Sequence, residues 1–377
     1  APADIDTAFS DFMPTFGLNM RQFDMMMKIY KILSQKYDVV CTNPPYMGGS
    51  GMNAKLSEFV KSKFPDYKSD LFSTFVIRCT QLCKAEGYLG FLTPYVWMFI
   101  QSYEKMRNYI YSTLIQFEYS AFEEATVPIC TFALKNSKVN KKGVYLRLTD
   151  FRGGMEVQRQ KTLEAIADHK CGYYFETNSA NFSKIPGSPV AYWVSENFIR
   201  AFERGISIDS ISDFTGSQHI TANNDKYLRL HWEIDANNVD WSEGAVQYYK
   251  TNSTSNLLAE KYRFKEGITY TELTSSVNTF RYLPPVCIFD KKGPSIVSVK
   301  KLWYCLGIFG TKIAPLYFAI LNPTLSTQVR DVKNLPIIVN GEIEPKIDEI
   351  VKENVEICKQ DWNDFETSWG FEKHPLI

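Results

Sequence analysis

Four consecutive residues, Asn43, Pro44, Pro45 and Tyr46, combine groups that could do chemistry on a flat, amine-bearing ring. They follow residues 39–41 (Val-Val-Cys), an apolar and partly β-branched run that predicts a buried strand. The two prolines end that strand, because each lacks a backbone N–H and has a fixed φ angle. We therefore expect a stiff loop at the carboxyl end of a strand, which is where open α/β sheets bind ligands.

The chemistry that this loop favours is methylation of an exocyclic amine. An adenine amino group is a poor nucleophile, because its lone pair is conjugated with the ring. The side-chain oxygen of Asn43 and the carbonyl of Pro44 could draw the amino nitrogen towards tetrahedral geometry, which frees that lone pair to attack a methyl sulfonium. Tyr46 offers a flat face for stacking a base extruded from a duplex. The alternative is a plain proline-rich turn after a core strand.

An Asn-Pro-Pro-Tyr loop at the end of a strand resembles the catalytic motif of the N6-adenine DNA methyltransferases. Residues 37–72 as a whole are similar to the PglX family of BREX phage-defence methyltransferases, and similar strings return at residues 227–230, 321–325 and 361–369. The resemblance spans nearly the whole chain. It implies S-adenosylmethionine as the methyl donor and double-stranded DNA as the substrate, and it leaves room for other phage-defence proteins as partners.

The resemblance also implies roles for single residues. Asp70, Leu71 and Phe72 begin a strongly amphipathic helix predicted over residues 70–84, with Asp70 or the serine before it as the N-cap. In the family this helix start borders the methyl-donor pocket, so the three residues are candidates for binding S-adenosylmethionine. A cap followed by core residues would explain the same sequence. Phe122 matches the place of a second aromatic residue that would stack on the flipped base, and it would suit a core equally well.

Part of the expected donor site has no counterpart in residues 1–36. The family's donor-binding strand and its acidic, glycine-rich turn should precede the Asn-Pro-Pro-Tyr loop, and nothing in this stretch matches them. The sequence also opens without a methionine. We therefore expect an internal or C-terminal fragment of a longer protein, with an incomplete S-adenosylmethionine site.

Helix patterns that alternate with strand patterns predict an α/β fold, in which a partial Rossmann-like methyltransferase sheet precedes an α+β target-recognition domain and a C-terminal helix. The expected parts are the second half of a catalytic domain at 1–150, a linker at 151–190, the DNA target-recognition domain at 191–340 and the helix at 341–377. A further helix is expected over residues 19–35, with a methionine-rich face packed in a core.

The resemblance places the DNA contacts in the recognition domain. Amide side chains suit bidentate bonds to adenine, arginine suits guanine and lysine suits phosphate. Residues 260–301 contain eight basic and four acidic residues, which makes this region the better candidate for facing phosphate. The candidate DNA-binding residues are Asn224, Arg229, Arg281, Lys291, Lys292 and Gln328. Any of them could instead be a turn former or a surface charge.

The remaining composition restricts the class of protein. The net charge is zero, which argues against a general nucleic-acid coat protein but allows a local basic surface. The eight cysteines form no Cys-x-x-Cys pair and the four histidines are scattered, so we expect neither a metal site nor a disulfide framework. The most apolar window, residues 89–100, is too short to span a bilayer, and no signal peptide is visible. A cytoplasmic protein without a membrane partner is therefore expected.

Three functions fit these observations. The first is a site-specific adenine DNA methyltransferase in phage defence or restriction-modification. The second is a DNA-binding recognition fragment without methyltransferase activity of its own. The third is part of a fused restriction-modification enzyme that also cuts DNA. Against cutting by this chain, its only nuclease-like residues, at 65–66 and 344–346, are too widely separated to form one site.

Overall fold

The computed structural model describes residues 20–107, 113–119, 121, 127–137, 142–214, 219–228, 239–274, 277–288, 293–368 and 370–376. Two compact units form within the chain. Unit 1 comprises residues 1–183 and 188–193, and unit 2 comprises residues 184–187 and 194–377.

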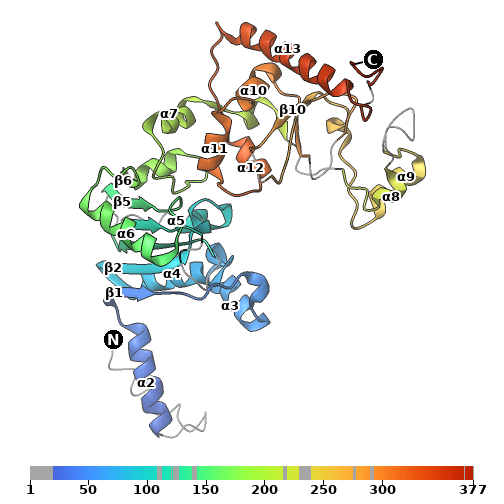
Figure 1. Cartoon of the computed structure of the whole chain (residues 1–377). Helices are drawn as coiled ribbons and strands as arrows, with labels where there is room; N and C mark the ends of the chain where they lie inside the picture. The colour runs from blue at the N-terminus through green and yellow to red at the C-terminus, as the bar shows by residue number, and fades with distance from the viewer. Residues whose placement is uncertain are drawn as a thin grey trace. The chain divides into compact units, whose positions relative to one another are not determined.

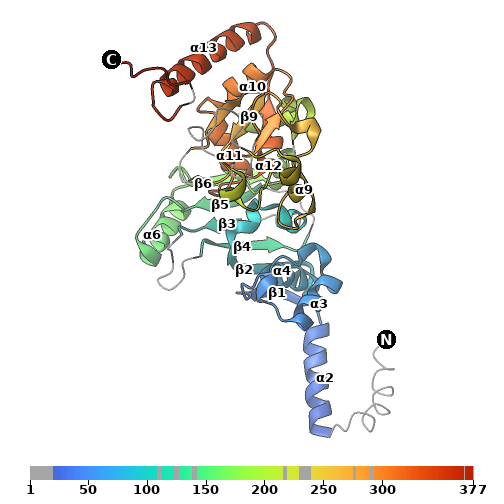
Figure 2. The same cartoon turned by 90° about the vertical axis from the view of Figure 1, so that its right-hand side faces the viewer.

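Unit 1 is built on a six-stranded sheet with the strand order β1-β2-β4-β3-β5-β6, which can be followed from strand to strand in Figure 2. The strands are β1 (Tyr37–Thr42), β2 (Cys83–Pro94), β3 (Thr113–Gln116), β4 (Ile129–Lys135), β5 (Lys142–Arg147) and β6 (Tyr174–Asn178). The helices, shown in Figure 1, are α2 (Met20–Ser34), α3 (Ala54–Lys63), α4 (Leu71–Leu82), α5 (Glu104–Arg107) and α6 (Gly154–Ala167).

Four strands of this sheet end at the same edge. β1 runs parallel to β2, and β3 runs parallel to β5, while β4 lies antiparallel between β2 and β3. Two successive antiparallel pairings restore the strand direction, so β1, β2, β3 and β5 all point the same way. The predicted α/β fold is confirmed, and the Asn43–Tyr46 loop follows β1 at the edge where such sheets bind ligands.

Helices cover both faces of the sheet. Successive residues of a strand point to opposite sides, so neighbouring residues of one strand pack against different helices. Tyr145 of β5 lies in the larger core together with Phe72 of α4. The next residue of the strand, Leu146, lies in a second cluster together with Ala165 of α6. Helix α4 is therefore anchored in the main core of unit 1.

β1 differs from the predicted buried strand. Among the described residues it is the edge strand of the sheet, hydrogen-bonded to β2 on one side, and its residue Val39 is 58% exposed. Cys41 is exposed as well. The prediction was wrong because an apolar run shows that a segment prefers a strand, but it does not show how many neighbours that strand has.

Helix α2 forms where a helix was predicted, but the predicted burial of its apolar face is wrong. None of its residues is buried, and Met26 and Leu33 are about half exposed. The C-terminal end of α2 is attached to α4, where the Arg78 guanidinium donates to the carbonyl of Leu33 at 3.1 Å. Helical periodicity predicted the helix correctly, whereas burial depends on what packs against it.

The segment predicted as a linker, residues 151–190, contains helix α6 and strand β6. β6 pairs antiparallel with β5 and so extends the sheet. Unit 1 therefore continues well beyond residue 150. Only Gln158 and Ala165 of α6 are buried, so the helix lacks the broad apolar stripe that would have indicated a packed element.

Unit 2 combines short antiparallel strands with helices. Its four-stranded sheet has the order β10-β9-β11-β8, and β12 pairs with β7. Ile268 of β9 and Ile296 of β11 are fully buried. The strands are β7 (Ile206–Ser207), β8 (Asp213–Phe214), β9 (Gly267–Tyr270), β10 (Phe280–Leu283), β11 (Ser295–Val297) and β12 (Pro336–Ile337). The helices are α7 (Glu196–Arg204), α8 (Asn224–Tyr227), α9 (Glu243–Thr251), α10 (Leu302–Phe309), α11 (Ala314–Leu321), α12 (Val329–Lys333) and α13 (Glu344–Asn363).

Helix α13 lies against α10 within unit 2 (Figure 1). A Cβ atom on Gly307 of α10 would come within 2.7 Å of the Val351 side chain, so the close approach depends on the glycine. Among the described residues, no single helix is both long and apolar enough to span a membrane; α10 and α11 pass that test only as a pair, and they are bent by 75°. All eight cysteines are free thiols.

Candidate active site

The hydroxyl of Tyr46 links the two ends of the Asn43–Tyr46 loop. It lies 3.2 Å from Oδ1 of Asn43 and 3.2 Å from the carbonyl oxygen of Leu92 in β2. A tyrosine hydroxyl has one proton, so it donates to one of these acceptors at a time. When the hydroxyl donates to Leu92, Oδ1 of Asn43 is free to accept a hydrogen bond from a substrate. Asn43 is exposed, whereas Pro44 is buried and fixes the loop to the sheet edge.

The ring of Tyr46 is accessible on the surface and packs against a buried residue. It is 39% exposed, and its ring meets the ring of Phe72 at a centroid distance of 6.4 Å and an angle of 86°. Phe72 is 1% exposed. Burial of the hydroxyl raises the pKa of Tyr46, and the neighbouring Cys130 raises it further. The hydroxyl is therefore protonated at neutral pH and remains a hydrogen-bond donor.

Asp70 connects the loop to the first turn of α4. Its Oδ1 accepts from the backbone N–H of Met47 at 2.9 Å and from the N–H of Phe72 at 3.1 Å. The bond to Phe72 caps the helix, as predicted for an aspartate at this position. The N–H of Leu71 also donates to the carbonyl of Met47 at 3.0 Å. The structure thus brings the predicted catalytic loop and the predicted donor-binding residues together.

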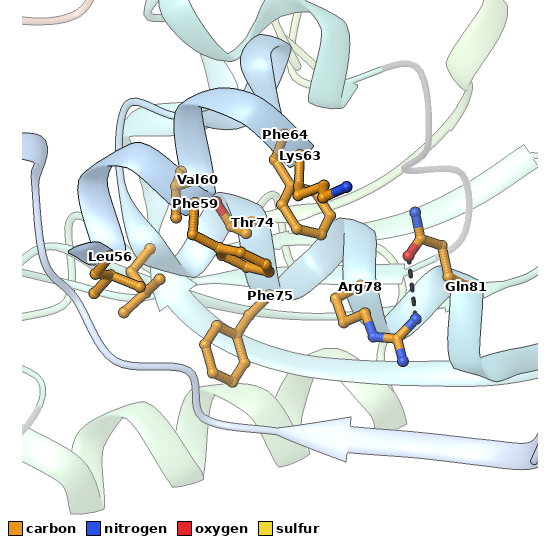
Figure 3. A pocket seen from close by; sticks show the side chains of 10 residues that line it. Leu56, Phe59, Val60, Lys63, Phe64, Thr74, Phe75, Arg78 and Gln81 are labelled. Atoms are coloured by element: carbon orange, nitrogen blue, oxygen red, sulfur yellow. Dashed lines mark hydrogen bonds between the residues drawn. The ribbon is translucent and has the colours of Figure 1, made fainter. Parts of the chain in front are cut away.

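A pocket of about 590 Å³ lies between α3 and α4, beside this junction (Figure 3). Its walls are mainly apolar, with Phe59 from α3 and Leu71 and Phe75 from α4. Two cations, Lys63 and Arg78, also line it. This volume lies in the range typical of sites for small ligands.

Helical spacing explains why α4 serves both the core and the pocket. Phe72 and Val76 point into the main core. Leu71 and Phe75 point to the pocket instead. Each precedes a core residue by one position, and the two lie four positions apart on one face of the helix. Sequence reasoning noted the apolar repeat of this helix but did not separate its two faces, and it missed Phe75 and the contribution of Phe59. The i, i+4 pair of Leu71 and Phe75, on a face separate from the core face, was the signal that could have indicated Phe75 as a pocket residue.

The other predicted site residues belong to other parts of the chain. Four of them lie outside the described part of the chain: Phe122, Arg229, Lys291 and Lys292. The remaining three are exposed and belong to different elements of unit 2: Asn224 in α8, Arg281 in β10 and Gln328 just before α12.

The hydrogen bonds of these three residues are local. The Asn224 side chain accepts from the Thr221 hydroxyl, and the Arg281 guanidinium donates to Thr271 at 3.1 Å. The backbone N–H of Gln328 donates to the carboxylate of an α12 residue, Asp331, at 2.9 Å. Such bonds order each element by itself. In the part of the chain that the structure describes, no group of three or more His, Cys, Asp or Glu residues is arranged to hold a metal ion.

Residues 6–122 match the family of Eco57I restriction-modification methylases. Over 389 residues the chain is 30% identical to the adenine-specific methyltransferase BrxX of Escherichia coli O9:H4 (strain HS), covering 92% of this chain and 31% of BrxX. It is 28% identical over 411 residues to the adenine-specific methyltransferase PglX of Lacticaseibacillus casei (strain Zhang), covering 93% of this chain and 33% of PglX. These matches confirm the predicted resemblance, and the chain spans about a third of the length of both relatives.

A solved structure has a similar fold. The type IIL restriction-modification enzyme MmeI, in complex with DNA, matches with a TM-score of 0.55 over 85% of this chain and 49% of the MmeI chain. The two are 10% identical, so the similarity concerns the fold alone.

Proposed function

We propose that this chain carries the catalytic loop and the target-recognition part of a site-specific DNA adenine N6-methyltransferase, which uses S-adenosylmethionine in phage defence or restriction-modification. The observation that carries the proposal is the Asn43–Tyr46 loop, with an exposed amide oxygen and an exposed ring at the carboxyl edge of an α/β sheet. The similarity to BrxX and PglX, which are adenine-specific methyltransferases, supports the same reaction for this chain.

In the proposed reaction, the loop activates the adenine amine by hydrogen bonding. Asn43 Oδ1 and the Pro44 carbonyl accept its two hydrogens, which localises the lone pair on nitrogen. The Tyr46 hydroxyl then donates to the Leu92 carbonyl, 3.2 Å away, and leaves Oδ1 to the substrate. Because the two acceptors are fixed before the base arrives, positioning and electrostatics supply the catalysis without a strong base. The exposed Tyr46 ring stacks on one face of the flipped adenine, and Phe122 is proposed to stack on the other face of the adenine.

The residues of the pocket between α3 and α4 fit a methyl donor of this kind. Leu71, Phe75 and Phe59 provide an apolar and aromatic surface for an adenosine ring, and Arg78 provides a cation for a carboxylate. When bound, S-adenosylmethionine supplies the electrophilic methyl group. Asp70 and Phe72, the other two predicted donor-binding residues, precede and follow Leu71 at the start of α4, but they do not line the pocket.

For unit 2 we propose DNA recognition. An enzyme that flips one base into a pocket reads its target sequence through other surfaces. Asn224, Arg229, Arg281 and Gln328 are the proposed contacts to bases, and Lys291 and Lys292 the proposed contacts to phosphate. Arg281 is exposed and held by its bond to Thr271, which suits a side chain that must meet DNA in one orientation.

The test is the substitution Asn43→Ala, assayed in the longest natural polypeptide that carries this sequence. Loss of the amide oxygen should lower kcat for methyl transfer to unmethylated genomic DNA by about 10²–10³-fold, while DNA affinity stays close to that of the wild type. Radiolabelled methyl incorporation and a DNA-binding titration measure the two effects. The matched control is Asn53→Ala, which removes an exposed asparagine that caps α3 by accepting from the Leu56 N–H.

Equal methylation by the wild type and Asn43→Ala would contradict the assignment. DNA binding by a wild-type polypeptide that transfers no methyl group would favour the alternative, a recognition fragment without activity of its own. Calorimetric titration of this chain with S-adenosylmethionine separates that case from one in which the donor binds but the target sequence is missing from the DNA.

A further inference from the structure

The carboxylate of Asp70 contacts both sides of the junction between the catalytic loop and α4. Oδ1 receives the N–H of Met47, the residue after Tyr46, as well as the N–H of Phe72. Gly48 and Asp70 also form an antiparallel bridge. These contacts join segments more than twenty positions apart in the sequence, so they hold the loop against the start of the helix.

Helix α4 is a rigid reference for that loop. Val76 is fully buried, and Phe72 packs against Tyr103 with ring centroids 5.3 Å apart. The prolines of the loop cannot provide the same constraint. They fix their own φ angles, which sets the local shape of the loop but does not set its place relative to the sheet and the pocket.

We propose that Asp70 is a positioning residue for the methyl transfer: by binding the backbone N–H of Met47, its carboxylate sets the place of Asn43 and Tyr46. The inference rests on the proposed function and assigns Asp70 to the loop rather than to direct contact with the donor. A displacement of about 1 Å in a reacting group can cost on the order of 10²-fold in rate, so loss of this bond reaches the chemistry although Asp70 touches no substrate.

Three variants separate the bond to the loop from the helix cap. Asp70→Ser keeps an N-cap oxygen for the Phe72 N–H, but serine has one bond fewer between backbone and oxygen and falls short of the Met47 N–H. Asp70→Asn retains an oxygen in the place of Oδ1. Asn53→Ala removes the cap of α3 and leaves the Met47 bond intact. All three are made in the longest natural polypeptide that carries the sequence, and thermal unfolding confirms that each is folded.

Two readouts are measured. The first is kcat and KM for unmethylated genomic DNA with S-adenosylmethionine. The second is hydrogen–deuterium exchange of the peptide that contains Met47, which reports the bond without catalysis. Asp70→Ser should lower kcat by about 10²-fold with little change in KM for DNA, and its Met47 peptide should exchange faster. Asp70→Asn and Asn53→Ala should resemble the wild type in both readouts.

The other possible results each overturn a different part of the proposal. Unchanged exchange in Asp70→Ser overturns the proposed link to the loop. Faster exchange with an unchanged kcat overturns the positioning role. A wild-type polypeptide that neither binds S-adenosylmethionine nor transfers a methyl group contradicts the proposed function instead, and the exchange measurement still decides whether Asp70 holds the loop.

Discussion

At the scale of single residues, the Tyr46 hydroxyl has a choice of two acceptors. The hydroxyl lies 3.2 Å from both Asn43 Oδ1 and the Leu92 carbonyl, so the amide can be held in place before a substrate arrives. The sequence alone predicted the loop and its chemistry, because Asn-Pro-Pro-Tyr after an apolar run is a local pattern. It could not predict the acceptor in β2, which lies 46 positions further along the chain.

Two substitutions of Tyr46 distinguish its ring from its hydroxyl. Tyr46→Phe keeps the stacking surface, so kcat/KM for methylation should fall only slightly. Tyr46→Ala removes the surface, and stacking on a flipped base is worth roughly 1–3 kcal/mol, so kcat/KM should fall by about 5- to 150-fold. Steady-state methylation of the same DNA compares the two. If both variants lose the same activity, the hydroxyl matters and the stacking proposal fails.

At the scale of elements, α4 joins the core, the loop and the pocket. Its extent was predicted closely, as residues 70–84 against the observed Leu71–Leu82, because the N-cap and the apolar spacing are visible in the sequence. The pocket was not predicted, since part of its wall comes from α3 and depends on how two helices pack. The same limit explains β1: its strand character was predicted, but its place at the edge was not.

The pocket proposal is tested by Phe75→Ala. Phe75 lines the pocket and is 38% exposed, so its removal should cost little stability. Loss of its buried contact with the donor should weaken binding of S-adenosylmethionine by roughly tenfold, from about 1–2 kcal/mol of apolar contact. Calorimetric titration measures this, and Tyr88→Ala, at an exposed position of β2, is the matched control. Unchanged affinity in Phe75→Ala would place the donor elsewhere.

At the scale of the whole molecule, the chain divides into two compact units, and most of the segment predicted as a linker, residues 151–190, lies in unit 1. This segment was predicted as a linker because the sequence of α6 has no broad apolar stripe, and only two of its residues are buried. Unit 2 contains a buried histidine, His219, which is 3% exposed and packs between Trp241 and Tyr249. Neither of its ring nitrogens hydrogen-bonds within the described residues.

This histidine should make unit 2 sensitive to acid. Burial lowers the pKa of His219, and the guanidinium of Arg263 lowers it further. As the pH falls below about 6.5, the unfolded chain binds a proton that the folded unit does not. Stability should therefore decrease, by up to about 1.4 kcal/mol per pH unit, until the folded-state pKa is reached.

Denaturant unfolding at several pH values between 7.5 and 5, followed by tryptophan fluorescence, measures this loss of stability. His219→Phe should remove part of the pH dependence, whereas His169→Phe, at an exposed ring stacked on Tyr174, should leave it unchanged. An identical acid profile in the wild type and His219→Phe would contradict the account.

The open edge of β1 has a practical consequence. A strand that offers unpaired backbone groups and apolar side chains is a template for aggregation. The one charged residue within β1 is Asp38, which pairs with Lys84 and is itself largely exposed. The six residues of β1 end directly at Asn43. Self-association through this strand would therefore obstruct the proposed catalytic loop, so aggregation would lower the activity of the purified protein without unfolding it.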